Sequence, residues 1–229
     1  MPFVKIGSKL IYFAHVPKCG GTTIESAIRS AGHNLNFYDK SWWSEERKWS
    51  RSSPQHITTK DLTRIIDIDI FDYTFTVIRD PVDRFISAFN HNRLDRRIAW
   101  YESLPKFLNK LEKSGDYFLY RFDNHFLPAS YFIPEKCEIF YLEDGMEPIR
   151  ARLSNITGGT LNSSEYERKN VRQYNNTKSK NIIKSFIKNN FQPIIPKKSE
   201  LNQEIELRIR EAYKVDYDLF YATRYLSEK

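Results

Sequence analysis

The sequence predicts an α/β protein, because three apolar, strand-like runs are each followed by a helix-like segment. Residues 10–16 are apolar and aromatic, and residues 24–31 then repeat apolar side chains with the period of one helix face. Residues 73–78 alternate aromatic and β-branched side chains and lead into a second helix. A third strand begins at Cys137, and a helix follows near residues 146–155. No internal repeat or domain-sized linker interrupts the chain, so residues 1–229 are expected to form a single domain.

The loop between the first strand and the first helix has the composition of an anion-binding turn. A proline and two glycines between residues 17 and 21 break the strand into a tight loop. A strand, a glycine loop and a helix N-terminus together aim backbone N–H groups at an anion. Lys18 adds a positive charge, and Thr22 and Thr23 add hydroxyl groups. This stretch therefore predicts a phosphate-binding loop.

The order of these residues differs from that of the common nucleotide-binding loop. In the Walker A pattern G-x-x-x-x-G-K-[ST], the lysine follows the second glycine and stands next to the hydroxyl that holds Mg²⁺. Here Lys18 precedes both Gly20 and Gly21. Cys19 lies between Lys18 and Gly20 and has two possible interpretations. It is either a small residue that fills the loop or a thiol made reactive by the helix N-terminus.

The composition favours a globular protein with anionic partners. The chain of 229 residues has a formal net charge of +7 and is 40% hydrophobic, so it can bury a core and attract phosphorylated, sulfated or acidic molecules. Its two cysteines make neither a disulfide framework nor a metal site, and no histidine and acidic residues have metal-ligand spacing. No apolar run approaches the roughly 20 residues of a membrane span, and no signal peptide is recognisable. We therefore expect a cytoplasmic protein, with peripheral membrane contact or a trimmed luminal domain as alternatives.

The region between the first helix and the second strand is polar and rich in tryptophan. Trp42, Trp43 and Trp49 lie among charged residues, which fits either stacking on a sugar or packing of a long loop onto the domain. His56 follows in a turn, just before a pair of threonines that can cap a short helix running to about residue 66. A lone histidine in a loop is most often a solvated side chain, so its position alone assigns it no role.

A second anion-binding pattern surrounds the next strand-to-helix junction. Asp80 and Pro81 are an N-cap and the residue favoured at the first helical position. Along this helix the apolar residues fall on one face, whereas Arg84 and Ser87 fall on the opposite, polar face. Arg79 ends the strand, so a phosphate held there would meet its planar guanidinium and the hydroxyl of Ser87.

The two patterns together resemble those of sulfotransferases that use 3′-phosphoadenosine-5′-phosphosulfate (PAPS). Residues 17–23, Pro-Lys-Cys-Gly-Gly-Thr-Thr, resemble the loop for the 5′-phosphosulfate, and residues 79–87, with Arg-Asp-Pro-x-x-Arg-x-x-Ser, match the motif for the 3′-phosphate. The sequence looks most similar to the carbohydrate sulfotransferases that include heparan sulfate 2-O-sulfotransferases and bacterial relatives. The resemblance covers most of residues 9–222. It implies a P-loop-like sulfotransferase fold, a short parallel sheet flanked by helices, with the nucleotide at the carboxyl ends of the strands.

The resemblance also implies a reaction. The enzyme would move the sulfuryl group of PAPS to a hydroxyl of an acceptor, expected to be a carbohydrate, and release adenosine 3′,5′-bisphosphate (3′,5′-ADP) without a metal. Lys18 would neutralise charge on the leaving oxygen. The residues implied to bind the donor are Lys18, Cys19, Gly20, Gly21, Thr22, Thr23, Arg79 and Ser87.

The acceptor hydroxyl needs a base, and the resemblance implies His56. Heparan sulfate 2-O-sulfotransferase-like enzymes use a histidine between the two donor motifs, and His56 matches by position. Glu45 and Glu46 are the alternatives, because other branches of the superfamily use a glutamate. His15, in the first strand, is expected to be structural. His91 and His125 are left open as further alternatives for the base. Lys169, Asn170 and Arg172 are candidates for contacting the nucleotide, because their loop closes over it in relatives.

Two other classes of function compete with this interpretation. A P-loop kinase for a small molecule or nucleotide would need an aspartate that holds Mg²⁺ at a strand end, for which Asp80 and Asp144 are weak candidates. A nucleic-acid-binding protein would show a recognised motif or a run of basic and aromatic residues, which the sequence lacks. Binding of 3′,5′-ADP compared with ATP–Mg²⁺ separates these hypotheses.

Overall fold

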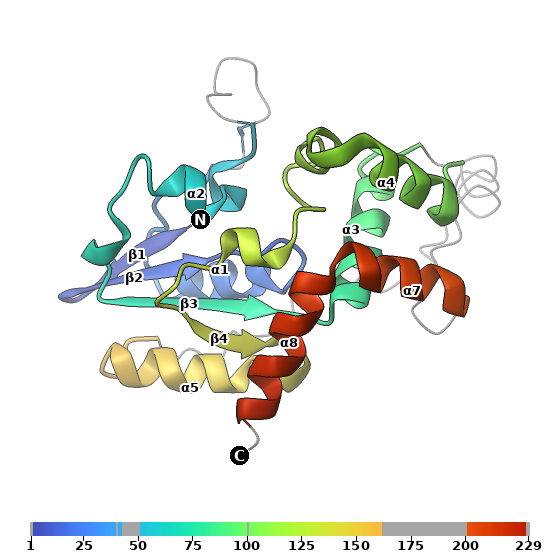
Figure 1. Ribbon diagram of the computed structural model, residues 1–229. Coiled ribbons are helices and arrows are strands. Elements are labelled where there is room, and N and C mark those ends of the chain that lie inside the picture. The colour runs from blue at the N-terminus through green and yellow to red at the C-terminus, as the bar shows by residue number, and fades with distance from the viewer. Residues whose placement is uncertain (1, 40, 43–50, 100, 162–200, 228–229) are drawn as a thin grey trace, which may run out of the picture.

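The strands of a computed structural model form one mixed sheet (Figure 1), as the sequence predicts for an α/β fold. The structure describes residues 2–39, 41–42, 51–99, 101–161 and 201–227. The sheet has the order β1 (Phe3–Ile6), β2 (Lys9–Ala14), β3 (Tyr73–Ile78) and β4 (Glu138–Tyr141). β2, β3 and β4 are parallel, as expected, and β1 is an antiparallel edge strand that the sequence analysis missed. Its four residues are too few for a clear alternation of apolar and polar side chains.

A helix follows each parallel strand. The described helices are α1 (Gly21–Ser30), α2 (Thr59–Leu62), α3 (Pro81–Leu94), α4 (Leu104–Tyr120), α5 (Glu147–Ile156), α7 (Gln203–Ala212) and α8 (Lys214–Ser227), with 3₁₀ turns at Pro54–His56, Ile68–Ile70, Ala129–Phe132 and Leu142–Asp144. Of these, α1 and α5 pack against the sheet, whereas α3 joins α4 and α7 in a separate helical group. The predicted caps are present, because Thr58 accepts a hydrogen bond from Asp61 N and Asp80 accepts from Val82 N and Asp83 N. Among these described helices, none is long and apolar enough to cross a bilayer.

The buried apolar residues form two clusters. One surrounds the sheet, where Ile24 and Ile28 of α1 and Ile149 of α5 pack against the strands. The other lies between α3, α4 and α7 and is rich in phenylalanine, with Phe89 and Phe107 both fully buried. Figure 1 shows this helical group beyond the arrowheads of β3 and β4, at the carboxyl ends of the parallel strands. Loops that leave those ends therefore lie between the two clusters.

A buried ion pair connects the two clusters. Arg84 of α3 is only 2% exposed, and its Nη1 lies 3.4 Å from Oδ2 of Asp216 on α8. Its Nε donates to the carbonyl of Pro17 at 3.1 Å, and its Nη2 donates to the carbonyl of Leu127 at 2.7 Å. Arg84 thus lies on the polar side of α3 but is covered by other segments. It holds the start of the glycine loop in place.

Candidate active site

The glycine loop joins β2 to α1 at the carboxyl edge of the sheet. Lys18 has a left-handed backbone with φ of 70°, and Gly20, the N-cap of α1, has φ of 85°. Such a conformation is uncommon for a lysine and is often found at functional sites. Gly20 supplies no side-chain cap to the first turn of α1, so that turn presents its backbone N–H groups in the way that suits an anion.

Gly21 is required by the close approach of a histidine. A Cβ atom at this position would lie 2.1 Å from Nε2 of His15, so any side chain would displace the imidazole or the loop. His15 is buried, and its Nδ1 lies 2.7 Å from Oε1 of the buried Glu25 on α1. This pairing agrees with the structural role expected for His15, since the ring packs directly against Gly21 of the loop.

Cys19 has the environment of a loop-filling residue. It is 1% exposed, and burial raises the pKa of its thiol to about 12, although the charges of Arg84 and Arg79 act in the opposite direction. A thiol that stays protonated is a poor nucleophile. The structure therefore favours the first of the two interpretations of Cys19, and it also places the guanidinium of Arg79 near the glycine loop.

The second predicted donor motif lies beside this loop. Arg79 directly follows β3, Ser87 lies in the second turn of α3, and both are half-buried. Asp80 and Asp144, the candidates for holding Mg²⁺ in a kinase, are both engaged elsewhere. Oδ1 of Asp80 caps α3, and Oδ1 of Asp144 accepts a hydrogen bond from Arg224 at 2.8 Å.

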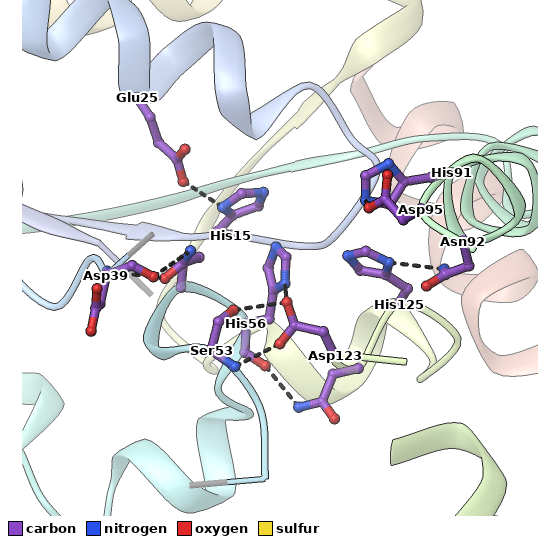
Figure 2. Close-up of polar contacts among 12 residues, drawn as sticks. His15, Glu25, Asp39, Ser53, His56, His91, Asn92, Asp95, Asp123 and His125 are labelled. Carbon is purple, nitrogen blue, oxygen red and sulfur yellow. Dashed lines mark hydrogen bonds and ion pairs between the residues drawn. The ribbon is translucent and has the colours of Figure 1, made fainter. Parts of the chain in front are cut away.

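His56 is part of a hydrogen-bonded pair that the sequence did not reveal. Its Nδ1 lies 2.8 Å from Oδ2 of the buried Asp123 (Figure 2). Ser53 donates to the same carboxylate through its backbone N–H at 2.6 Å and its hydroxyl at 2.9 Å. Burial opposes ionisation of Asp123, but His56 and Ser53 outweigh it and lower the pKa of the carboxyl. An ionised carboxylate that accepts from Nδ1 leaves the lone pair of His56 on Nε2.

The backbone around Asp123 is shaped to reach His56. Asp123 and Asn124 have φ of 55° and 60°, two consecutive left-handed residues. Aspartate and asparagine tolerate this conformation better than most residues. While Asp123 meets the ring of His56, Nδ2 of Asn124 donates to the backbone carbonyl of His56 at 2.8 Å. The histidine is therefore fixed at both its ring and its backbone.

Four histidine rings form a row that passes through His56. Ring centroids are 4.9 Å apart for His15 and His56, 5.1 Å for His56 and His125, and 4.9 Å for His91 and His125 (Figure 2). His56, Asp123 and His125 each bring one nitrogen or oxygen atom within 4.8 Å of the others, close enough for a metal ion. Spacing in the sequence gave no sign of this group. Hydrogen bonds already occupy Nδ1 of His56 and both oxygens of Asp123.

Other predicted candidates are less informative. Trp42 is 2% exposed, so it packs into the protein and does not present its ring to a sugar. The remaining candidates lie outside the described residues; they are Trp43, Trp49, Glu45, Glu46, Lys169, Asn170 and Arg172.

Comparison with known proteins identifies the family. The sulfotransferase family model matches residues 2–222, nearly the whole chain, and the chain therefore belongs to the sulfotransferase family. No curated protein and no solved structure matches it. The family accounts for the parallel sheet with its glycine loop between β2 and α1, and it makes the reaction a sulfuryl transfer.

Proposed function

We propose that this sulfotransferase moves the sulfuryl group from PAPS to a hydroxyl of a carbohydrate and uses His56 as the base. The observation that carries the proposal is the His56–Asp123 pair, whose 2.8 Å contact orients an imidazole close to the predicted donor loop. The charge of Lys18 helps to lower the pKa of His125, whose ring neighbours that of His56, which supports a place for Lys18 near the proposed base. These observations support a site in which a base, a cation and an anion-binding loop would act together.

The donor would be held at both ends. The backbone N–H groups of residues 19–23 and the hydroxyls of Thr22 and Thr23 would bind the 5′-phosphosulfate, with Lys18 at the oxygen that bridges sulfur and phosphorus. Arg79 and Ser87 would bind the 3′-phosphate, the group that distinguishes PAPS from ATP. The uncapped first turn of α1 and the proximity of Arg79 to the loop support this arrangement.

The transfer step would run in line between two oxygens. Nε2 of His56 takes the proton of the acceptor hydroxyl as that oxygen attacks sulfur. The bond between sulfur and the bridging oxygen breaks, its electron pair stays on the 5′-phosphate of 3′,5′-ADP, and Lys18 neutralises the added charge. Asp123 stays ionised, because its two oxygens accept hydrogen bonds from His56 and Ser53. Its negative charge then stabilises the imidazolium that forms on His56. Positioning and charge stabilisation dominate such group transfers.

A carbohydrate is the acceptor class that the motif resemblance to heparan sulfate 2-O-sulfotransferase-like enzymes supports. The net charge of +7 agrees with an acidic glycan. The kinase alternative has no supporting observation among the described residues, since its candidate Mg²⁺ ligands, Asp80 and Asp144, serve as a helix cap and in an ion pair.

The donor half of the proposal is tested by calorimetric binding of 3′,5′-ADP and of adenosine 5′-monophosphate, which lacks the 3′-phosphate. Arg79→Ala should weaken 3′,5′-ADP binding by about 2–4 kcal/mol, the scale for a buried charge pair, and should hardly change binding of the monophosphate. Arg29→Ala, which removes the same charge from the exposed end of α1, is the matched control. Equal losses for both nucleotides would show that Arg79 is structural.

The acceptor half is tested with ³⁵S-labelled PAPS and a panel of glycans. Label should appear in a glycan with the wild-type chain, and His56→Ala should reduce kcat by roughly 10²–10⁴-fold, the span for a positioned base. Binding of 3′,5′-ADP should survive this substitution. A His56→Ala variant that keeps its kcat would assign the base to another residue.

A further inference from the structure

His125 is a buried imidazole beside the proposed base to which the transfer step above gives no role. It lies in the segment between α4 and the turn Ala129–Phe132, and only 4% of its surface is exposed. Its ring is 5.1 Å from that of His56. A polar side chain is rarely buried at such a place without a partner for each nitrogen. The question is which nitrogen carries the proton.

The neighbouring asparagine fixes the tautomer of His125. Nδ2 of Asn92 lies 2.8 Å from the backbone carbonyl of Ala88, which can only accept a hydrogen bond, so this atom must be the amide nitrogen. The same nitrogen lies 3.0 Å from Nδ1 of His125 and donates its second hydrogen there. Nδ1 therefore holds a lone pair, and the neutral ring carries its proton on Nε2. His125 is thus a hydrogen-bond donor at Nε2.

The surroundings keep this imidazole neutral. Burial lowers the pKa of His125 well below its usual value, and the nearby charges of His56, His91, Lys18 and Arg97 act in the same direction. Within the described part of the chain, no hydrogen-bond acceptor engages Nε2, and Figure 2 shows the ring nitrogen that faces away from Asn92 turned toward His56. The donor therefore points toward the ring of His56, the proposed base.

We propose that Nε2–H of His125 donates a hydrogen bond to a non-bridging oxygen of the sulfuryl group during its transfer. This inference rests on the proposed function. In an in-line transfer the sulfuryl group lies between the attacking oxygen, next to His56, and the leaving oxygen, next to Lys18. His125 adjoins His56 and lies within the electrostatic reach of Lys18, so it borders the path between them.

The role of His125 differs from that of the base. It keeps its proton throughout, and no bond to it forms or breaks. A neutral donor fixed before the reaction stabilises charge on the sulfuryl oxygens without a cost for reorienting at the moment of transfer. Asn92 acts as a positioning residue, because its amide sets the tautomer and so decides that Nε2 is a donor.

The tautomer is tested directly, without donor or acceptor, by ¹⁵N–¹H correlation spectra of the histidine side chains in the ¹⁵N-labelled full chain. We expect one neutral imidazole at neutral pH with its proton on Nε2 and with signals that disappear in His125→Gln. A His125 resonance with the proton on Nδ1 would overturn the inference.

Kinetics test the role in transfer with two amides of different reach. The amide nitrogen of glutamine takes roughly the place of Nε2 in histidine, and that of asparagine roughly the place of Nδ1. His125→Gln should therefore stay within about tenfold of wild-type kcat, whereas His125→Asn should lose on the order of 10²–10³-fold, as when an oxyanion donor is removed. His91→Gln, on the other side of the ring, is the matched control and should change kcat little.

Affinity and stability measurements separate this role from a structural one. Binding of 3′,5′-ADP and the melting temperature should be similar in the glutamine and asparagine variants. Equal kcat values for the two variants, or a loss that follows the melting temperature, would refute the inference while leaving the proposed function intact. If the wild-type chain binds no 3′,5′-ADP and transfers no label from PAPS, the proposed function is wrong and the inference falls with it.

Discussion

Arg84→Met is expected to destabilise the fold and the donor loop together. The guanidinium contacts the carbonyls of Pro17 and Leu127 at 3.1 and 2.7 Å, and Oδ2 of Asp216 at 3.4 Å. Methionine keeps much of the apolar stem, but it leaves the carbonyl of Leu127 without its donor, the carbonyl of Pro17 with only the weak thiol donor of Cys19 at 3.8 Å, and a buried carboxylate without its counter-charge. Each orphaned acceptor costs about 1–3 kcal/mol, and breaking a buried ion pair costs about 3–5 kcal/mol.

These costs overlap, because Asp216 keeps two other hydrogen bonds. The backbone N–H groups of Ala129 and Ser130 donate to its oxygens at 2.6 and 3.1 Å. Burial already raises the pKa of Asp216 despite the charge of Arg84, so the carboxyl can become protonated once that charge is removed. We therefore expect a total loss of about 4 kcal/mol, within the range for broken buried pairs.

Urea unfolding of four proteins measures this loss: the wild type, Arg84→Met, Asp216→Asn and the double variant. The double variant should lose about 1–3 kcal/mol less than the sum of the two single losses, because the second substitution removes a partner already orphaned. Arg64→Met is the control, since Arg64 has 71% of its side chain exposed and should change stability by less than about 0.5 kcal/mol. An Arg84→Met loss below about 1 kcal/mol, or additive losses, would refute the reasoning.

The remaining predictions concern the active site. Asp123→Asn should lower kcat by roughly 10²–10⁴-fold at unchanged 3′,5′-ADP affinity, because an amide no longer requires the proton of His56 to sit on Nδ1. Initial rates measure kcat and calorimetry measures the affinity. A near-normal kcat would contradict this prediction. Lys18→Ala should reduce kcat far more than it reduces donor affinity, since charge develops on the leaving oxygen only during transfer. A variant with a raised KM and a normal kcat would show that Lys18 only binds the donor. The buried His125 has a lowered pKa and stays neutral in the folded protein, whereas the same residue in the unfolded chain takes up a proton below about pH 6.5. The free energy of unfolding should therefore fall as the pH decreases, by up to about 1.4 kcal/mol per pH unit. Urea midpoints from about pH 7.5 to about pH 5.5 should show this slope, which His125→Gln should reduce; an identical slope in that variant would show that His125 does not contribute.

Local sequence patterns were sufficient to predict the strand and the helix cap that carry the second predicted donor motif. The strand at Tyr73–Ile78 and the cap at Asp80 were both predicted at the positions where the structure has them. Alternation, capping and glycine breaks depend on neighbouring residues, which is why they can be read without tertiary information. The antiparallel strand Phe3–Ile6 was missed because it is short and depends on pairing with β2.

Contacts between distant segments could not be predicted in this way. Asp123 lies 67 residues from His56, and the backbone that brings it to the ring is left-handed, which no local pattern predicted. Helical periodicity placed Arg84 on a polar face and could not show that Asp216, 132 residues further on, covers that face. Asn92 falls on the buried side of α3 and gave no sign that it sets a tautomer. In each case the partner, and not the residue type, decides the role.

The buried Arg84–Asp216 pair has a consequence for the order of events during synthesis of the chain. The ribosome produces the glycine loop and Arg84 before α8. The carboxylate of Asp216, which pairs with this arginine, follows it by 132 residues. At about 5–20 residues per second, this interval lasts roughly 7–26 s. Until α8 leaves the ribosome, Arg84 has no counter-charge, so a nascent chain can form its sheet but cannot complete its donor loop. We expect the loop, although it is made long before α8, to become competent to bind a nucleotide only after α8 has folded against it.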